Sequence, residues 1–127
     1  MTTVTIDQIL QIQVLAIKHS GGSGGVRDMG RLDAAIAAQT QEVFGQELYP
    51  TICDKAAAMI RGIICDHPFH DGNKRTAMLV GLTFLAVNGA SFEAARGEIE
   101  NFAVRVAVDR LDVEDIASWL RAHSGAL

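Results

Sequence analysis

Hydrophobic residues recur every three or four positions along most of the chain, which is typical of helices that bury one face. The first such stripe consists of Ile6, Leu10, Val14 and Ile17. Thr5 and Gln8 stand at the spacing of a capping box in front of this stripe, so we expect a first helix to begin here. Four glycines within residues 21–25 then predict a loop over His19–Asp28.

A second stripe, over Leu32–Val43, predicts a second helix with Gly45 as its stop signal. A third helix is expected to begin after Thr51, which is a good N-cap residue. It should end at Asp66 or one residue later, because Pro68 pushes the residue before it out of the α region.

Three more helices are predicted in the second half of the chain. The apolar run that begins near Asn73 and closes at Asn88 is almost continuous, which implies a helix buried on most sides. Periodic residues over Ile99–Val106 give a fifth helix, and those over Val113–Leu120 give a sixth, capped by Asp112.

No stretch of four or more residues alternates with the period of a strand. We therefore predict an all-α fold, a compact bundle of about six helices that forms a single domain over residues 1–127. A short extended piece is expected near Ala90–Phe92, and Trp119, which lies on the last helix, is expected to be a packing residue.

Composition narrows the class of protein. The chain has 127 residues, of which 49% are hydrophobic and 20% charged, and Cys53 and Cys65 are too few for a disulfide scaffold. The first residues carry no pattern of a secretory signal, and the longest apolar stretch is too short to cross a membrane. A net charge of −4 argues against a general nucleic-acid-binding protein. We expect a soluble cytoplasmic protein.

The stretch HPFHDGNKR, residues 67–75, lies between the third and fourth predicted helices. The first turn of a helix has unpaired N–H groups and a partial positive charge, so it attracts phosphate. Gly72 lets the backbone approach an anion closely, and Lys74 and Arg75 add positive charge from the same turn. This part of the stretch predicts an anion-binding site.

An acid and a base stand beside these cations. Asp71 would repel a phosphate unless a divalent cation lies between them, which makes it a candidate Mg²⁺ ligand. The neutral imidazole of His67 can take a proton from a hydroxyl that attacks phosphorus.

Structural interpretations of the same residues remain open. Asp71 could simply cap the fourth helix, and Asn73 could be a turn residue. Lys74 and Arg75 could form a solvated first turn, although cations are disfavoured there unless an anion compensates them. A transition-metal site is a further alternative, formed by Cys65, His67, His70 and Asp71, although the spacing matches no familiar zinc motif.

Two residues after the glycines are also singled out. Asp28 is expected to cap the second helix, whereas a substrate contact stays open for Arg27.

The stretch resembles the signature of the Fic/Doc family, His-x-Phe-x-Asp/Glu-Gly-Asn-x-Arg. The matching residues are His67, Phe69, Asp71, Gly72, Asn73 and Arg75. Three further segments resemble the death-on-curing (Doc) branch, namely GGSGGVRDMGRLDAAI, DKAAAMIRGIICDHPF and TAMLVGLTFLAVNG. The resemblance covers about Ile6 to Leu120 and implies a Fic/Doc-like helical fold.

The resemblance also implies a reaction. Fic enzymes that transfer AMP usually have glycine where this chain has Lys74, and a second arginine where it has Met78. Lys74 is typical of Doc proteins, which transfer the γ-phosphate of ATP to a threonine of elongation factor Tu and so inhibit translation. Transfer of AMP or another nucleotidyl group, or a non-catalytic interaction module, stays as the alternative.

The roles of the family residues carry over by position. The resemblance implies that His67 is the general base and Asp71 the Mg²⁺ ligand, with Phe69 anchoring the loop in the core. The phosphates of ATP would be held by Gly72, Asn73, Lys74 and Arg75.

The resemblance further implies control by a partner protein. The inhibitory helix of many Fic proteins has the pattern Ser/Thr-x-x-x-Glu-Gly/Asn, and near Glu100-Asn101 this chain has Arg96 at the Ser/Thr position. By resemblance the inhibitor is a separate antitoxin with a disordered tail, in a bacterial toxin–antitoxin system.

Overall fold

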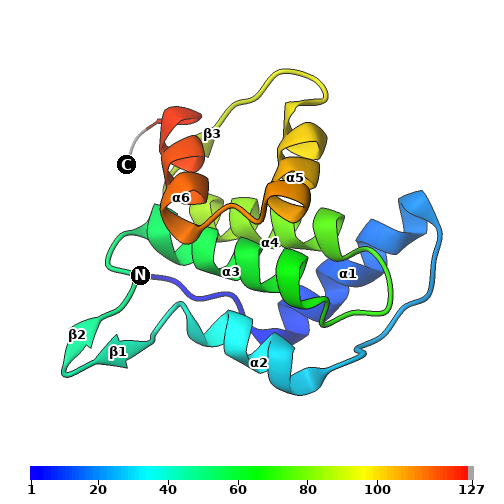
Figure 1. Ribbon diagram of the computed structural model, residues 1–127, viewed down its shortest axis with the longest axis horizontal. Helices are drawn as coiled ribbons and strands as arrows, with labels where there is room; N and C mark the ends of the chain where they lie inside the picture. The colour runs from blue at the N-terminus through cyan, green and yellow to red at the C-terminus, as the bar shows by residue number, and fades with distance from the viewer. Residues whose placement is uncertain (126–127) are drawn as a thin grey trace.

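The computed structural model describes residues 1–125, so the last two residues of the expected 1–127 domain lie outside it. The described part is mainly helical, as predicted (Figure 1). Its helices are α1 (Ile6–Ser20), α2 (Met29–Ala37), α3 (Ile52–Asp66), α4 (Asn73–Val87), α5 (Glu98–Asp109) and α6 (Val113–Ala122). Its strands have two residues each: β1 (Glu42–Val43), β2 (Gln46–Glu47), β3 (Ser91–Phe92) and β4 (Ser124–Gly125). None of the helices within residues 1–125 has the length and hydrophobicity needed to span a membrane.

Helices α3 and α4 form the centre of the molecule (Figure 1). Helix α3 also packs against α2 and α6, and α4 against α1 and α5. The two central helices approach closely at Gly81, where any Cβ would collide with the side chain of Ile60. Both helices contribute fully buried side chains to the core, such as Met59 from α3 and Phe84 from α4. Residues 67–72 connect the end of α3 to the start of α4, so the packing of this pair places both ends of the connection.

The predicted helix starts are confirmed where a local cap marks them. Thr5 caps α1 and Thr51 caps α3, each within a reciprocal capping box. Asp28 caps α2, and Asp112 caps α6 through the N–H of Asp115.

The predicted extent of the second helix is wrong. Helix α2 ends at Ala37, and Val43 lies instead in a hairpin formed by β1 and β2, which projects from the body (Figure 1). Phe44 and Gly45 both have positive φ, 52° and 78°, as the tight two-residue turn of a hairpin requires. Gly45 therefore turns the hairpin and does not stop a helix.

The buried face of α1 also differs from the predicted stripe. Val14 is 55% exposed, whereas Ile9, Gln13 and Ala16 form the buried face. A buried glutamine needs hydrogen-bond partners, because an unpaired buried amide costs about 1–3 kcal/mol. Its partners lie in the candidate site described below.

The C-terminal part agrees with expectation. The extended piece expected near Ala90–Phe92 is β3, which pairs with β4. The ring of Trp119 stacks on Phe102 with centroids 4.0 Å apart, so Trp119 is a packing residue, as predicted.

Candidate active site

The loop between α3 and α4 lies against the segment that follows the glycine-rich loop. The backbone N–H groups of Arg27 and Asp28 donate to the carbonyl of Pro68, at 2.7 and 3.0 Å. The N–H of His70 donates to the carbonyl of Gly25 at 3.2 Å. The segment from Gly25 to Asp28, which lies far ahead of the motif in the sequence, therefore fixes the path of the motif loop.

His67 forms the C-cap of α3 in the left-handed conformation, with φ 50° and ψ 58°. A residue with a Cβ adopts this conformation at a cost, so the surroundings must hold it. Arg27 Nε donates to the His67 carbonyl at 2.8 Å. Within residues 1–125 no hydrogen-bond partner occupies the exposed imidazole, which leaves it accessible to a substrate hydroxyl.

Two arginines complete the end of α3. Arg27 Nη2 and Arg31 Nη1 donate to the carbonyl of Asp66, at 3.0 and 2.9 Å. Positive side chains at a helix C-terminus satisfy its free carbonyls and complement its dipole. The guanidinium of Arg27 is thus used within the fold, so the structure supports a positioning role for it in place of the substrate contact left open above.

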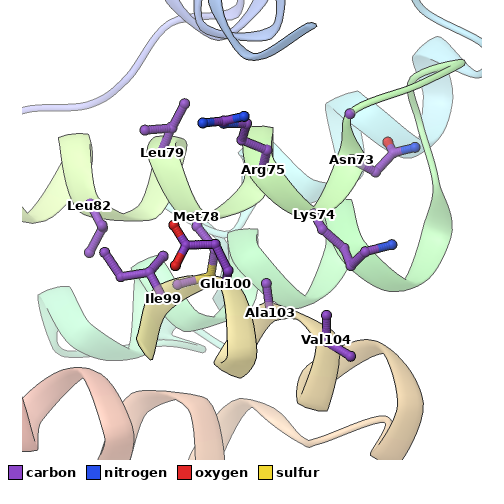
Figure 2. Close-up of a pocket in the computed structure, with 11 residues that line it drawn as sticks. Asn73, Lys74, Arg75, Met78, Leu79, Leu82, Ile99, Glu100, Ala103 and Val104 are labelled. Carbon is purple, nitrogen blue, oxygen red and sulfur yellow. The ribbon is translucent and has the colours of Figure 1, made fainter. Parts of the chain in front are cut away.

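Phe69 is fully buried, as expected for the residue that anchors the loop. The side chain of Asn73 forms hydrogen bonds with both the N–H and the carbonyl of Phe69. The Phe69 N–H donates to Asn73 Oδ1 and Asn73 Nδ2 donates to the Phe69 carbonyl, each at 3.0 Å. In Figure 2 the Asn73 side chain is turned toward this loop. The expected phosphate contact of Asn73 stays a prediction, while its amide shapes the loop.

Asp71 does not cap α4. The N-cap of α4 is Gly72, and within the described residues 1–125 no side-chain hydrogen bond caps this helix. The carboxylate of Asp71 instead accepts a hydrogen bond from the N–H of Ser23, at 2.7 Å to Oδ2. The carbonyl of Asp71 accepts one from Nε2 of Gln13 at 3.2 Å. Asp71 is exposed, so its second carboxylate oxygen can serve a metal ion.

The start of α4 combines free N–H groups with positive side chains. Gly72 has φ 73°, and a Cβ there would lie 3.0 Å from Ile17 Cγ2, so this position needs glycine. Lys74 and Arg75 are exposed, and no carboxylate within residues 1–125 lies within ion-pair distance of either. The other helix without a side-chain cap bond at its start, α5, has Glu98 and Glu100 in its first turn. In α4 the positive end of the helix dipole bears two cations and no acid, an arrangement that favours a bound anion.

A groove with a volume of about 460 Å³ runs from this helix start between α4 and α5 (Figure 2), and we call it the α4–α5 groove. Apart from the two cations and from Asn73 and Glu100, its lining residues are apolar or glycine. It is formed by Gly72, Asn73, Lys74, Arg75, Met78, Leu79, Leu82, Ile99, Glu100, Ala103 and Val104. His67 and Asp71 are not among the lining residues. The cavity therefore adjoins the first turn of α4, whereas His67 and Asp71 lie on the open loop.

The arrangement fits Mg²⁺ better than zinc. Within residues 1–125 no three His, Cys, Asp or Glu side chains come together as metal ligands, so the zinc alternative has no support. Mg²⁺ commonly takes one or two carboxylates together with substrate phosphates and waters. A single carboxylate, Asp71, beside the positively charged start of α4 suits that mode.

Two contributors to this site, Gln13 and Ser23, were not predicted from the sequence. Gln13 is only 2% exposed, and its Oε1 accepts a hydrogen bond from Gly25 N–H at 3.4 Å. The spacing in the sequence could have predicted this burial. Gln13 lies four positions after Ile9 and three before Ala16, and thus on the same face of a helix as these apolar residues. Ser23 contributes only its backbone N–H, for which the sequence carries no signal.

Comparisons with known proteins agree with the motif. The model of the Fic/DOC family matches residues 3–85. The "Toxin Doc" of Mycolicibacterium smegmatis is 40% identical over 110 residues, covering 84% of this chain and 83% of that protein. The "Protein kinase doc" of Escherichia phage P1 is 28% identical over 127 residues, covering 99% and 98%.

Proposed function

This chain belongs to the Fic/DOC family, and we propose that it is a toxin of the Doc type that transfers the γ-phosphate of ATP to a protein hydroxyl. The names of its relatives, a toxin and a protein kinase, support this activity. The proposed target is a threonine of elongation factor Tu, whose phosphorylation would stop translation and growth in the bacterial cytoplasm.

One observation carries the proposal: the start of α4 presents unpaired N–H groups, Lys74 and Arg75 without any compensating acid in that turn. Two adjacent cations at the positive end of a helix destabilise the free protein. A polyphosphate would remove that penalty and would lie beside Asp71 and His67. Phosphoryl transfer depends mainly on such positioning and charge neutralisation.

Each residue has a defined task in this mechanism. The first N–H groups of α4, beginning at Gly72, bind phosphate oxygens together with the side chains of Lys74 and Arg75. Asp71 would hold Mg²⁺, which neutralises charge on the phosphates when bound. His67 accepts the proton of the target hydroxyl as the oxygen attacks phosphorus, and ADP leaves with the electrons of the broken P–O bond.

In this proposal Asn73 supports the site by holding the loop that carries the reacting residues. Its side-chain amide holds Phe69, and through it the loop that bears His67 and Asp71. Its Nδ2 gives one of its two N–H groups to Phe69, so a direct contact of Asn73 with phosphate would come from the backbone N–H or from the second N–H of Nδ2.

The proposed orientation of the donor rests on Lys74, which is typical of Doc proteins, and on Met78. Met78, one turn after Arg75, lines the α4–α5 groove where AMP-transferring relatives of the family carry a second arginine. Without that anchor for the terminal phosphates, the γ-phosphate is the group presented to the base.

We further propose an antitoxin whose disordered tail folds on this protein, in line with the relative named a toxin. The apolar α4–α5 groove ends at Lys74 and Arg75. A tail that forms an amphipathic helix could bury its apolar face there and keep a substrate from the cations.

The test compares two labels on the same donor. The protein is incubated with elongation factor Tu, Mg²⁺ and ATP labelled at either the γ- or the α-phosphate. Label on the target from γ-labelled ATP alone supports the kinase. Label from α-labelled ATP selects nucleotidyl transfer, and growth inhibition that persists in His67→Ala selects a non-catalytic module.

A further inference from the structure

We infer that Gln13, a residue of α1 outside the motif, is a positioning residue that sets the place of the Asp71 carboxylate. The inference rests on the proposed function, in which Asp71 is the metal ligand. It extends that site to a helix that is distant in sequence, since Gln13 and Asp71 are separated by 58 positions.

Gln13 uses both ends of its amide across two loops. Its Nε2 donates to the Asp71 carbonyl at 3.2 Å, and its Oε1 accepts from the Gly25 N–H at 3.4 Å. The side chain is buried, so these two bonds replace the water that the amide loses on folding. Gln13 therefore ties the glycine-rich loop and the motif loop to one point on α1.

The glycine-rich loop then acts on the carboxylate itself. The N–H of Ser23 donates to Asp71 Oδ2 at 2.7 Å, which fixes one oxygen and leaves the other available. Gly22 lies so close that a Cβ on it would be 2.9 Å from Asp71 Cβ. The loop thus contacts Asp71 through the hydrogen bond of Ser23 and the close approach of Gly22, and Gln13 bonds the same loop at Gly25 and the motif loop at Asp71.

Such outer contacts matter for metal sites, because they orient a ligand before the metal arrives. Loss of a group of this kind typically lowers metal affinity or activity about 10- to 100-fold. The effect should be specific to the metal, since Gln13 does not line the groove or belong to the phosphate-binding turn.

The experiment measures Mn²⁺ binding, by the electron paramagnetic resonance signal of free Mn²⁺, in the presence of a non-hydrolysable ATP analogue. Gln13→Met keeps the length of the side chain and removes both hydrogen bonds. We expect its Mn²⁺ affinity to fall about 10-fold or more, with affinity for the analogue in EDTA unchanged. Excess Mg²⁺ should restore kcat. Gln11→Met, an exposed glutamine of the same helix, is the matched control and should behave as wild type.

A second pair of variants keeps the test decisive if Gln13→Met does not fold. Gly21 and Gly22 both have positive φ, 76° and 108°, but only a Cβ on Gly22 would meet Asp71. Alanine at either position strains the backbone. Only Gly22→Ala should weaken Mn²⁺ binding, whereas equal effects of Gly21→Ala and Gly22→Ala would overturn the inference.

The outcomes separate this inference from the proposed function. Wild type that binds Mn²⁺ with the analogue, and loses it in Asp71→Asn, supports Asp71 as the ligand. If Gln13→Met then binds Mn²⁺ as tightly as wild type, the role of Gln13 is wrong although the proposed function stands. If wild-type protein binds no Mn²⁺ with the analogue, the proposed metal site fails, and the inference fails with it.

Discussion

The side-chain amide of Asn73 pairs with the backbone of Phe69 in both directions, through two hydrogen bonds of 3.0 Å. This bracket joins the first residue of α4 to the buried anchor of the motif loop. His70, Asp71 and Gly72 are enclosed between its two ends, so the bracket fixes the turn from which the acid projects. Asn73 therefore acts on the site by holding the backbone.

Replacing Asn73 by alanine should lower the free energy of unfolding by about 1–3 kcal/mol, because two buried backbone groups of Phe69 lose their partners. Chemical denaturation of the purified protein measures this change. Asn101→Ala is the control, since Asn101 is exposed on α5, and it should stay within about 0.5 kcal/mol of wild type. Equal stability of Asn73→Ala and wild type would contradict the bracket.

His67→Ala should reduce the rate of phosphoryl transfer about 10² to 10⁴-fold, because a general base typically contributes that factor. Affinity for ATP should change little, since the imidazole acts on the hydroxyl of the target. His70→Ala is a close control, being an exposed histidine of the same loop at a variable position of the motif. A comparable loss of rate in His70→Ala would point to damage of the loop and not to loss of the base.

Lys74→Gln and Arg75→Gln should affect stability and binding in opposite directions. Removing either cation from the N-terminus of α4 should stabilise the ATP-free protein by about 0.3–1 kcal/mol. The same change should weaken ATP binding, which calorimetry can follow. Lys18→Gln, in the last turn of α1, serves as the comparison and should destabilise slightly, because there the cation faces the negative end of a helix.

His123 and Glu98 form a pair 2.8 Å apart that should make stability depend on pH. The hydrogen bond to the Trp119 carbonyl, and then the contact with Glu98, raise the pKa of His123 above its usual 6.5. The Ala95 N–H, and then His123, lower the pKa of Glu98 below its usual 4.5. The contribution of His123 to the stability of the fold is full below pH 6.5 and is lost as the pH rises through the raised pKa of His123. The contribution of Glu98 to stability is present above pH 4.5 and is lost as the pH falls through the lowered pKa of Glu98.

The pair therefore contributes most at about pH 5–6, between these values. The difference in unfolding free energy between wild type and His123→Gln should be largest there and smaller at about pH 9. When His123→Gln is made in a protein that already carries Glu98→Gln, the stability difference that it causes should depend less on pH. A difference that is constant with pH would show that His123 acts only through its ring packing.

Signals within one turn of a helix predicted much of the fold. Thr5, Thr51 and Asp112 cap helices as expected, because a cap depends on a few neighbouring residues. The motif also placed its loop correctly between α3 and α4. The hairpin was missed, because Gly45 serves a helix stop and a tight turn equally well. The positive φ of Phe44 is rare for a bulky residue, and the residues around it do not predict it.

Long-range contacts set the features that the sequence did not predict. The stripe of α1 suggested that Val14 is buried, but the buried face turns toward Gln13, where two distant loops meet. The hydrogen bonds from Arg27 to the carbonyls at the end of α3 likewise depend on how α2 packs against α3. Neither arrangement can be read from the periodicity of a single helix.

The most direct measurement of the central claim is the intact mass of elongation factor Tu after incubation with this protein and ATP·Mg²⁺. We expect the mass of one phosphate to be added to a threonine by wild type, and no addition by His67→Ala. An added nucleotidyl group, or an unmodified target with wild-type protein that binds ATP, would contradict the account.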